Sequence, residues 1–91
     1  MSKIKLVEAT APWCGVCKMI KPSIERFMQK FPDVEFKVVD IEADEEGKRL
    51  VEDYGIKSVP AFFFYKDGIC VEHHLGNISL PELKNKLNNL K

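Results

Sequence analysis

The chain has 91 residues, of which 45% are hydrophobic and 31% are charged, a composition typical of one globular domain over residues 1–91. Its 14 basic and 14 acidic side chains cancel, so we expect no nucleic-acid partner and no attraction to an anionic membrane. No apolar run approaches the roughly 20 residues of a membrane span, and lysines interrupt the segment that a secretory signal would use.

Short apolar segments alternate with segments of helical periodicity. Apolar residues three and four apart after Cys17 predict a helix, which Pro32 ends. Gly55 predicts the end of a second helix, and Ser79 begins a third, with Glu82 reaching back to cap it. The expected elements are strand 3–9, helix 17–31, strand 34–41, helix 44–54, strand 59–65, strand 69–75 and a last helix whose apolar stripe is Leu80, Leu83, Leu87 and Leu90.

The order of these elements, βαβαββα, predicts how the strands pair. A right-handed crossover through the first helix makes the first two strands parallel. The turn at Lys66-Asp67-Gly68 joins the last two strands into an antiparallel hairpin. We therefore expect an α/β protein in which a parallel pair is extended by a hairpin.

Two cysteines, Cys14 and Cys17, lie between the first strand and the first helix. A thiol in the first turn of a helix faces unpaired N–H groups and the positive end of the dipole, which favour the thiolate that attacks disulfides. Zinc is the alternative, because Cys70 and His73 would complete a four-ligand set. Residues three apart on a strand point to opposite faces, so we favour a redox pair without metal. Cys70 is then a structural thiol, and His73 and His74 face solvent.

Several separated motifs occur together in this chain: Trp13-Cys14-Gly15-Val16-Cys17-Lys18-Met19-Ile20-Lys21-Pro22, Tyr54-Gly55-Ile56, Val59-Pro60, Lys66-Asp67-Gly68 and Gly76. With these motifs the chain resembles the thioredoxin family, from about Leu6 onward. That family has a central sheet with helices on both faces and reduces protein disulfides. The resemblance implies a minimal version with a four-stranded mixed sheet, in which residues 34–41 form an uncovered edge strand. It implies a monomer that needs no cofactor, acts on disulfide-containing proteins and is recycled by a thioredoxin-reductase-type donor.

Two other functions stay open at the level of the sequence. A glutaredoxin-like, glutathione-dependent enzyme usually has tyrosine between its cysteines and a late glycine pair, where this chain has Gly76-Asn77. A non-catalytic, thioredoxin-like subunit would use its groove or its edge strand to bind a partner, although the intact cysteines argue against it. The odd number of cysteines argues for a reducing compartment, and we expect a cytoplasmic protein.

The resemblance and the helix position together predict the roles of the site residues. Cys14, first in the helix, is the expected exposed attacker, and Cys17 resolves the mixed disulfide. Glu8 stands where the family has a buried aspartate, so we expect a raised pKa and proton transfer from Cys17. Pro60 is expected to follow a cis bond. An apolar groove for an extended substrate would consist of Trp13, Gly15, Val59, Pro60, Leu75 and Gly76.

Two positions depart from the family pattern beside these residues. Val16 replaces the usual proline and restores an N–H, which we expect to donate to the Cys14 thiolate. Val38 stands where the family often has a lysine near the acid. Lys37 precedes it by one residue and is therefore expected on the opposite face of its strand.

Overall fold

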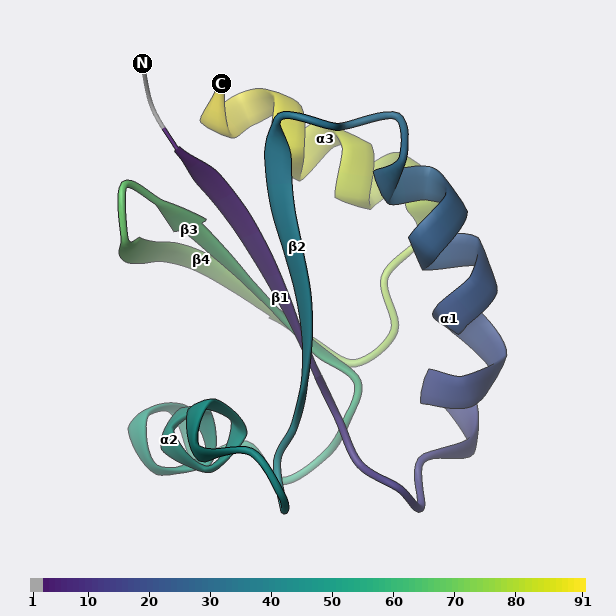
Figure 1. The fold of residues 1–91 in the computed structure, drawn as a ribbon, viewed down its shortest axis with the longest axis vertical. Helices are drawn as coiled ribbons and strands as arrows, with labels where there is room; N and C mark the ends of the chain where they lie inside the picture. The colour runs from purple at the N-terminus through teal and green to yellow at the C-terminus, as the bar shows by residue number, and fades with distance from the viewer. Residues whose placement is uncertain (1–2) are drawn as a thin grey trace.

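The computed structural model describes residues 3–91 (Figure 1). Its elements follow the predicted order, and their bounds differ from the predicted ones by a few residues at most. None of the helices in this part of the chain is long and apolar enough to cross a membrane. The elements are β1 (Ile4–Thr10), α1 (Gly15–Met28), β2 (Val34–Asp40), α2 (Glu45–Tyr54), β3 (Ala61–Lys66), β4 (Ile69–Leu75) and α3 (Leu80–Leu90).

The four strands form one mixed sheet in the order β2-β1-β3-β4. As predicted, β1 and β2 are parallel, while β3 runs antiparallel to both β1 and β4. Glu8, in the middle of β1, lies between Val38 of β2 and Phe62 of β3. The central position of β1 therefore places Glu8 inside the sheet, and β2 lies at an edge, as expected.

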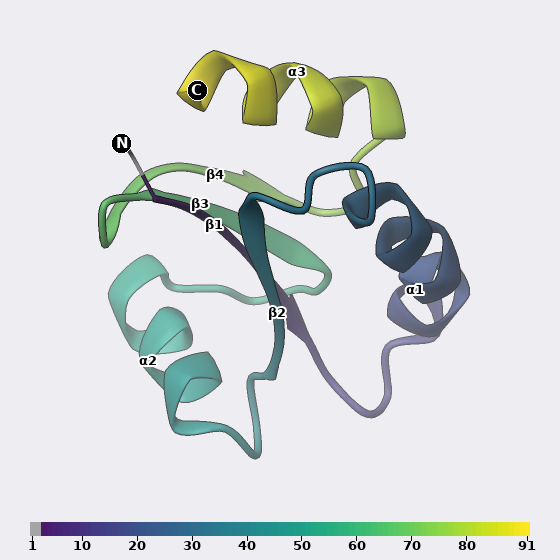
Figure 2. The ribbon, with the colours of Figure 1, turned by 45° about the horizontal axis from the view of Figure 1, so that its top comes forward.

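Helices cover both faces of the sheet (Figure 2), which confirms the predicted fold class. Side chains alternate along each central strand, so that Phe62 and Phe64 pack toward α1 and α3 while Phe63 packs toward α2. The core on the α1 and α3 face also contains Leu6, Ile24, Phe27, Met28, Leu83 and Leu87, and the core on the α2 face contains Val7, Ala9, Val39, Leu50 and Ile56.

The start of α3 differs in one detail from the predicted capping box. Ser79 does cap the helix, because its Oγ accepts the N–H of Glu82 at 3.3 Å. The Glu82 carboxylate, however, lies 3.4 Å from the imidazole of His74 on β4 rather than reaching back to the cap. Of the predicted apolar stripe, Leu83 and Leu87 are fully buried, whereas Leu80 is exposed. The contact of Glu82 with His74 of β4 thus replaces the second half of the box.

A β-bulge in β4 overturns the argument that Cys70 and His73 point to opposite faces. Tyr65 pairs with Cys70, but Phe64 pairs with Glu72, so Val71 is an extra residue without a partner on β3. The inserted residue shifts the alternation by one. Cys70 and the exposed His73 consequently both lie on the α2 face, where the His73 ring stacks on Phe63.

Gly47 lies at a close approach between α2 and the end of β2. It is buried, and a β-carbon built on it would fall inside van der Waals contact with the carbonyl group of Asp40. Because the obstacle is backbone, no side chain can rotate away to make room. The sequence pattern of α2 did not indicate this contact, since a glycine inside a helical segment indicates only a low helix propensity.

We expect Gly47→Ala to lower the free energy of unfolding by about 1–3 kcal/mol, the cost of overpacking, despite the higher helix propensity of alanine. Urea unfolding followed by circular dichroism measures the change. Gly15→Ala is the matched control, because a β-carbon on that helical glycine has nothing within 4 Å. Equal stabilities of the two variants would contradict the close approach.

Candidate active site

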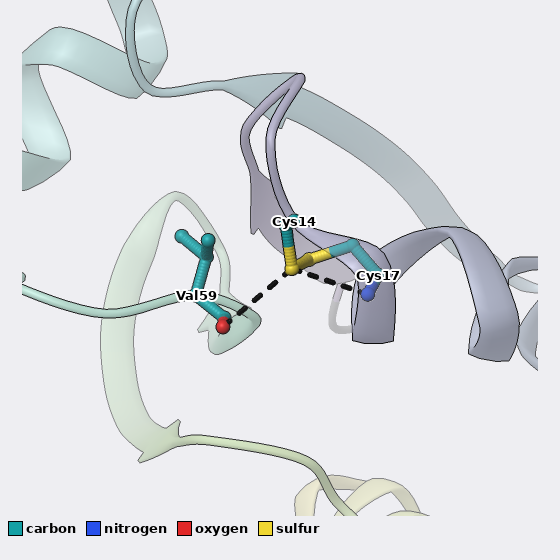
Figure 3. Close-up of a disulfide and its surroundings, with 3 residues drawn as sticks. All are labelled: Cys14, Cys17 and Val59. Carbon is teal, nitrogen blue, oxygen red and sulfur yellow. Dashed lines mark hydrogen bonds between the residues drawn. A yellow bond between two sulfur atoms is a disulfide. The ribbon is translucent and has the colours of Figure 1, made fainter.

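Cys14 is the N-cap of α1, and its sulfur closes the first turn of the helix. The N–H of Cys17 donates to Cys14 Sγ at 3.1 Å, and the N–H of Lys18 donates to the Cys14 carbonyl at 3.3 Å. Cys14 and Cys17 are joined by a disulfide, with their Cα atoms 5.3 Å apart (Figure 3). The sulfur thus occupies the position where an N-cap oxygen normally accepts a hydrogen bond, as expected of a thiol at the positive end of a helix.

A loop before β3 lies against this disulfide. Val59 and Pro60 are joined by a cis peptide bond, as predicted, and the Val59 carbonyl oxygen lies 3.6 Å from Cys14 Sγ (Figure 3). Pro60 is buried, and its carbonyl accepts the N–H of Gly76 at 2.8 Å. The structure therefore places Val59 beside Cys14 and joins Gly76 to the adjacent Pro60 by a main-chain hydrogen bond.

The expectation that Cys14 is exposed is wrong for this disulfide form. Cys14 is 5% exposed and Cys17 4%, so accessibility does not distinguish the two residues. The physical reason is the Val59 carbonyl, which lies against the Cys14 sulfur on the side away from α1. What does distinguish them is the hydrogen bond, because only the Cys14 sulfur caps the helix.

The rest of the predicted groove is accessible. Trp13 is 61% exposed, and its indole Nε1 donates to Glu42 Oε2 at 2.7 Å. Leu75 is also exposed, and its strand position opposite Ala61 places it next to the Pro60 segment. Gly15 is exposed at the start of α1. The sequence did not predict the contact with Glu42, since that residue is 29 positions from Trp13. Its only signal is a carboxylate that can accept the indole N–H.

The buried carboxyl group of Glu8 lies on the α1 and α3 face of the sheet, like its even-numbered neighbours in β1. Glu8 is 3% exposed, and burial raises its pKa to about 7. The nearby Glu25 carboxylate raises this pKa further, while Lys21 opposes the shift. Cys17, Lys21 and Glu25 are four residues apart in turn, so they form one row along α1. Glu8 thus faces the row that begins with Cys17.

No lysine of β2 lies on the face that holds Glu8. Val38 is the register partner of Glu8, and Lys37 points to the other face, where its Nζ donates to Glu46 of α2 at 2.8 Å. This confirms the predicted orientation of Lys37. The charges that act on Glu8 come from α1 instead, and desolvation outweighs the attraction of Lys21.

One further expectation needs correction. His74 does not face solvent, because it contacts the Glu82 carboxylate and its Nε2 lies 3.0 Å from the Asn77 carbonyl. In the disulfide form, the amide that donates to Cys14 Sγ is that of Cys17, and an additional bond from Val16 to a Cys14 thiolate stays a prediction. Within residues 3–91, no group of three or more His, Cys, Asp or Glu side chains is arranged to hold a metal.

Known proteins are similar to this chain in sequence and in fold. The family model described as Thioredoxin matches residues 1–89. Thioredoxin 1 of Synechococcus elongatus is 37% identical over 82 residues, 90% of this chain and 75% of that protein. Bacillus subtilis thioredoxin is 40% identical over 86 residues, 91% of this chain and 81% of that protein. The X-ray structure of Fasciola hepatica thioredoxin aligns with a TM-score of 0.82 and 31% identity, over 98% of this chain and 82% of that one.

A disulfide capping a helix in this fold defines a dithiol–disulfide oxidoreductase. More particularly, the chain belongs to the thioredoxin family. It reduces protein disulfides through the Cys14-Gly15-Val16-Cys17 dithiol by way of a mixed disulfide, and a reductase returns electrons to it. The glutaredoxin-like and non-catalytic alternatives are thereby set aside.

We expect the raised pKa of Glu8 to make the oxidised protein less stable as pH rises. Between the unfolded value of 4.5 and the folded value of about 7, the unfolded chain loses the Glu8 proton while the folded chain keeps it. The contribution of Glu8 to the free energy of unfolding is therefore fully present below pH 4.5. As pH rises through 7 this contribution is lost, and the free energy of unfolding falls by about 3 kcal/mol in all. Unfolding at several pH values measures it, and Glu8→Gln should remove this part of the dependence. A wild type and a variant with parallel profiles would contradict the raised pKa.

Proposed function

We propose that Cys14 is the attacking thiol and Cys17 the resolving thiol of this thioredoxin. The capping hydrogen bond supports the assignment, since a donor 3.1 Å from Cys14 Sγ stabilises a thiolate there before substrate arrives. Cys17 lies one turn further along α1 and supplies that donor from its backbone. Only the Cys14 sulfur accepts this capping hydrogen bond, and the proposal depends on that difference between the two cysteines.

The exchange proceeds in two balanced steps. The Cys14 thiolate attacks one sulfur of a substrate disulfide, forms a mixed disulfide and releases the other substrate sulfur as a thiolate. Cys17 then loses its proton and attacks Cys14 Sγ, which forms the Cys14–Cys17 disulfide and releases the second substrate thiolate. The substrate disulfide is reduced by two electrons, and the protein dithiol is oxidised by two.

We propose further that Glu8 accepts the proton that Cys17 loses. A carboxyl with a pKa of about 7 is partly ionised at neutral pH, so it can receive a proton and later return it. Its burial on the face covered by α1, beside the row that contains Cys17, supports a transfer directly or through one water. An unshifted glutamate would be too weak a base for a thiol at neutral pH.

The substrate is proposed to lie extended along Trp13, Gly15, Val59, Pro60, Leu75 and Gly76. The exposed Trp13, directly before Cys14, and Leu75, opposite Ala61 in the sheet, offer apolar contacts. The Val59 segment lies beside Cys14, where an extended peptide could form main-chain hydrogen bonds with it. One chain supplies all of these residues, which supports catalysis by the monomer.

We also propose that the protein works in the cytoplasm and passes electrons from a thioredoxin-reductase-type donor to its substrates. The odd cysteine, Cys70, supports a compartment where thiols stay reduced. Equilibration against glutathione tests the direction of electron flow. Thioredoxins as a class have potentials of about −270 mV, and a value near the roughly −180 mV of protein disulfide isomerase would instead indicate an oxidant.

We expect Cys17→Ser to accumulate a mixed disulfide with a substrate such as insulin, because nothing attacks Cys14 Sγ once it has reacted. Cys14→Ser should accumulate none. Non-reducing electrophoresis after acid quenching measures the adduct, and the wild type with dithiothreitol as electron source should precipitate insulin. Equal alkylation of the two thiols by iodoacetamide at neutral pH would contradict the assignment.

Glu8→Gln should slow the resolving step about 10²-fold, the lower range for loss of a general base, while the first attack keeps its rate. Stopped-flow tryptophan fluorescence can follow both steps, since Trp13 is the only tryptophan and precedes Cys14. Glu52→Gln is the matched control, because it makes the same change at an exposed position on α2, which packs on the other face of the sheet. A Glu8 variant that resolves as fast as the control would rule out the proton transfer.

A further inference from the structure

The strand β2 presents an open edge to solvent. Within residues 3–91 it pairs with β1 on one side only, and Figures 1 and 2 show no helix of this part of the chain crossing its outer side. The N–H of Ile41 donates to Thr10 of β1 at 2.9 Å. Since backbone groups alternate along a strand, the odd-numbered residues of β2 face β1 and the even-numbered ones face outward. Phe36 and Val38 therefore direct their N–H and carbonyl groups away from the sheet.

The two ends of this edge are already engaged within the chain. The N–H of Val34 donates to the Phe31 carbonyl at 2.9 Å. The N–H of Asp40 donates to Asp44 Oδ2 at 2.8 Å. A strand that pairs with this edge must therefore find its hydrogen bonds at Phe36, at Val38 and at the Val34 carbonyl. These groups limit the length of the pairing and the register it can take.

The side chains on this short edge are complementary to themselves. We propose that two copies of this chain associate through β2, antiparallel, with Phe36 on the two-fold axis. In that register Glu35 of each copy lies directly opposite Lys37 of the other copy, so the two-fold axis produces the pair twice. On the other face, Val34 lies opposite Val38. The partner is thus a second copy, and charge complementarity selects it.

Neighbouring registers are unfavourable for the same reason. A two-fold axis at Lys37 would place the Lys37 side chains of the two copies directly opposite each other. An axis at Glu35 would likewise place the two Glu35 side chains opposite each other. Only the axis at Phe36 gives opposite charges on both sides. It also gives four main-chain hydrogen bonds, because the N–H of Phe36 meets the Phe36 carbonyl and the N–H of Val38 meets the Val34 carbonyl, each twice.

The charged pair and Val38 are accessible in the single chain, whereas Phe36 is half-buried and Val34 is buried. The side chains of Glu35 and Lys37 are 69% and 51% exposed, and Val38 is an exposed apolar residue on the edge. Lys37 already binds Glu46, but an ammonium group has three donors and can bind Glu35 of the second copy as well. A lysine usually protects an edge strand from pairing, and here the glutamate two residues away offsets it.

Sedimentation over a range of concentrations, in dithiothreitol, tests the association. We expect the wild type to approach twice its 10.4 kDa mass. Glu35→Lys and Lys37→Glu should each weaken the dimer at least about tenfold, because each places two like-charged pairs opposite each other. The double variant should recover wild-type association. An equimolar mixture of the two single variants should form a heterodimer, because the lysine introduced at position 35 faces the glutamate at position 37.

A second variant probes the backbone separately. Val38→Pro removes the outward N–H without removing a ladder bond to β1, so it should abolish association while circular dichroism stays that of the folded protein. A wild type that is monomeric at every concentration, or a dimer that the charge reversals leave unchanged, would overturn the proposal. A dimer that dissociates in dithiothreitol would also overturn it, since a Cys70 disulfide would then be the link.

Discussion

The helix α1 begins at a sulfur atom where a serine or aspartate oxygen usually stands. Cys14 Sγ accepts the amide of Cys17, and the Cys14 carbonyl accepts the amide of Lys18, so the turn is closed around the reacting atom. Charge that gathers on this sulfur during exchange meets a donor that is already oriented. The end of β1 carries this turn, and the Val59 segment fixes its other side. The chemistry of the protein depends on that geometry.

The central position of β1 explains the second unusual feature, a carboxyl group inside the sheet. Both neighbouring strands pair with Glu8, through Val38 and Phe62, and α1 covers it. Desolvation there outweighs the attraction of Lys21, so the group holds its proton up to about neutral pH. Glu8 weakens the fold when it ionises. Local choices that oppose stability are expected at functional sites, and the burial of Glu8 is the kind of choice that its proposed role in proton transfer would explain.

Local patterns were sufficient to predict most of the fold and part of the site. Periodicity predicted the order of the elements, Gly55 predicted the end of α2, and alternation predicted that Lys37 lies on the face of the sheet away from Glu8. Contacts between distant segments escaped the same reasoning. The bond from Trp13 to Glu42 and the backbone approach at Gly47 each join residues that no local rule connects. The burial of the Cys14 sulfur likewise depends on a loop 45 residues away.

The bulge at Val71 has a consequence for how the sheet can grow. It lies in β4, the strand at the edge opposite β2, and it breaks the regular spacing of that strand. A filament of stacked sheets needs two pairing edges on every molecule, one to receive and one to offer. A bulged strand twists away from such pairing. The proposed pairing through β2 would therefore close at two molecules, because the bulge makes β4 a poorer edge for adding a further sheet.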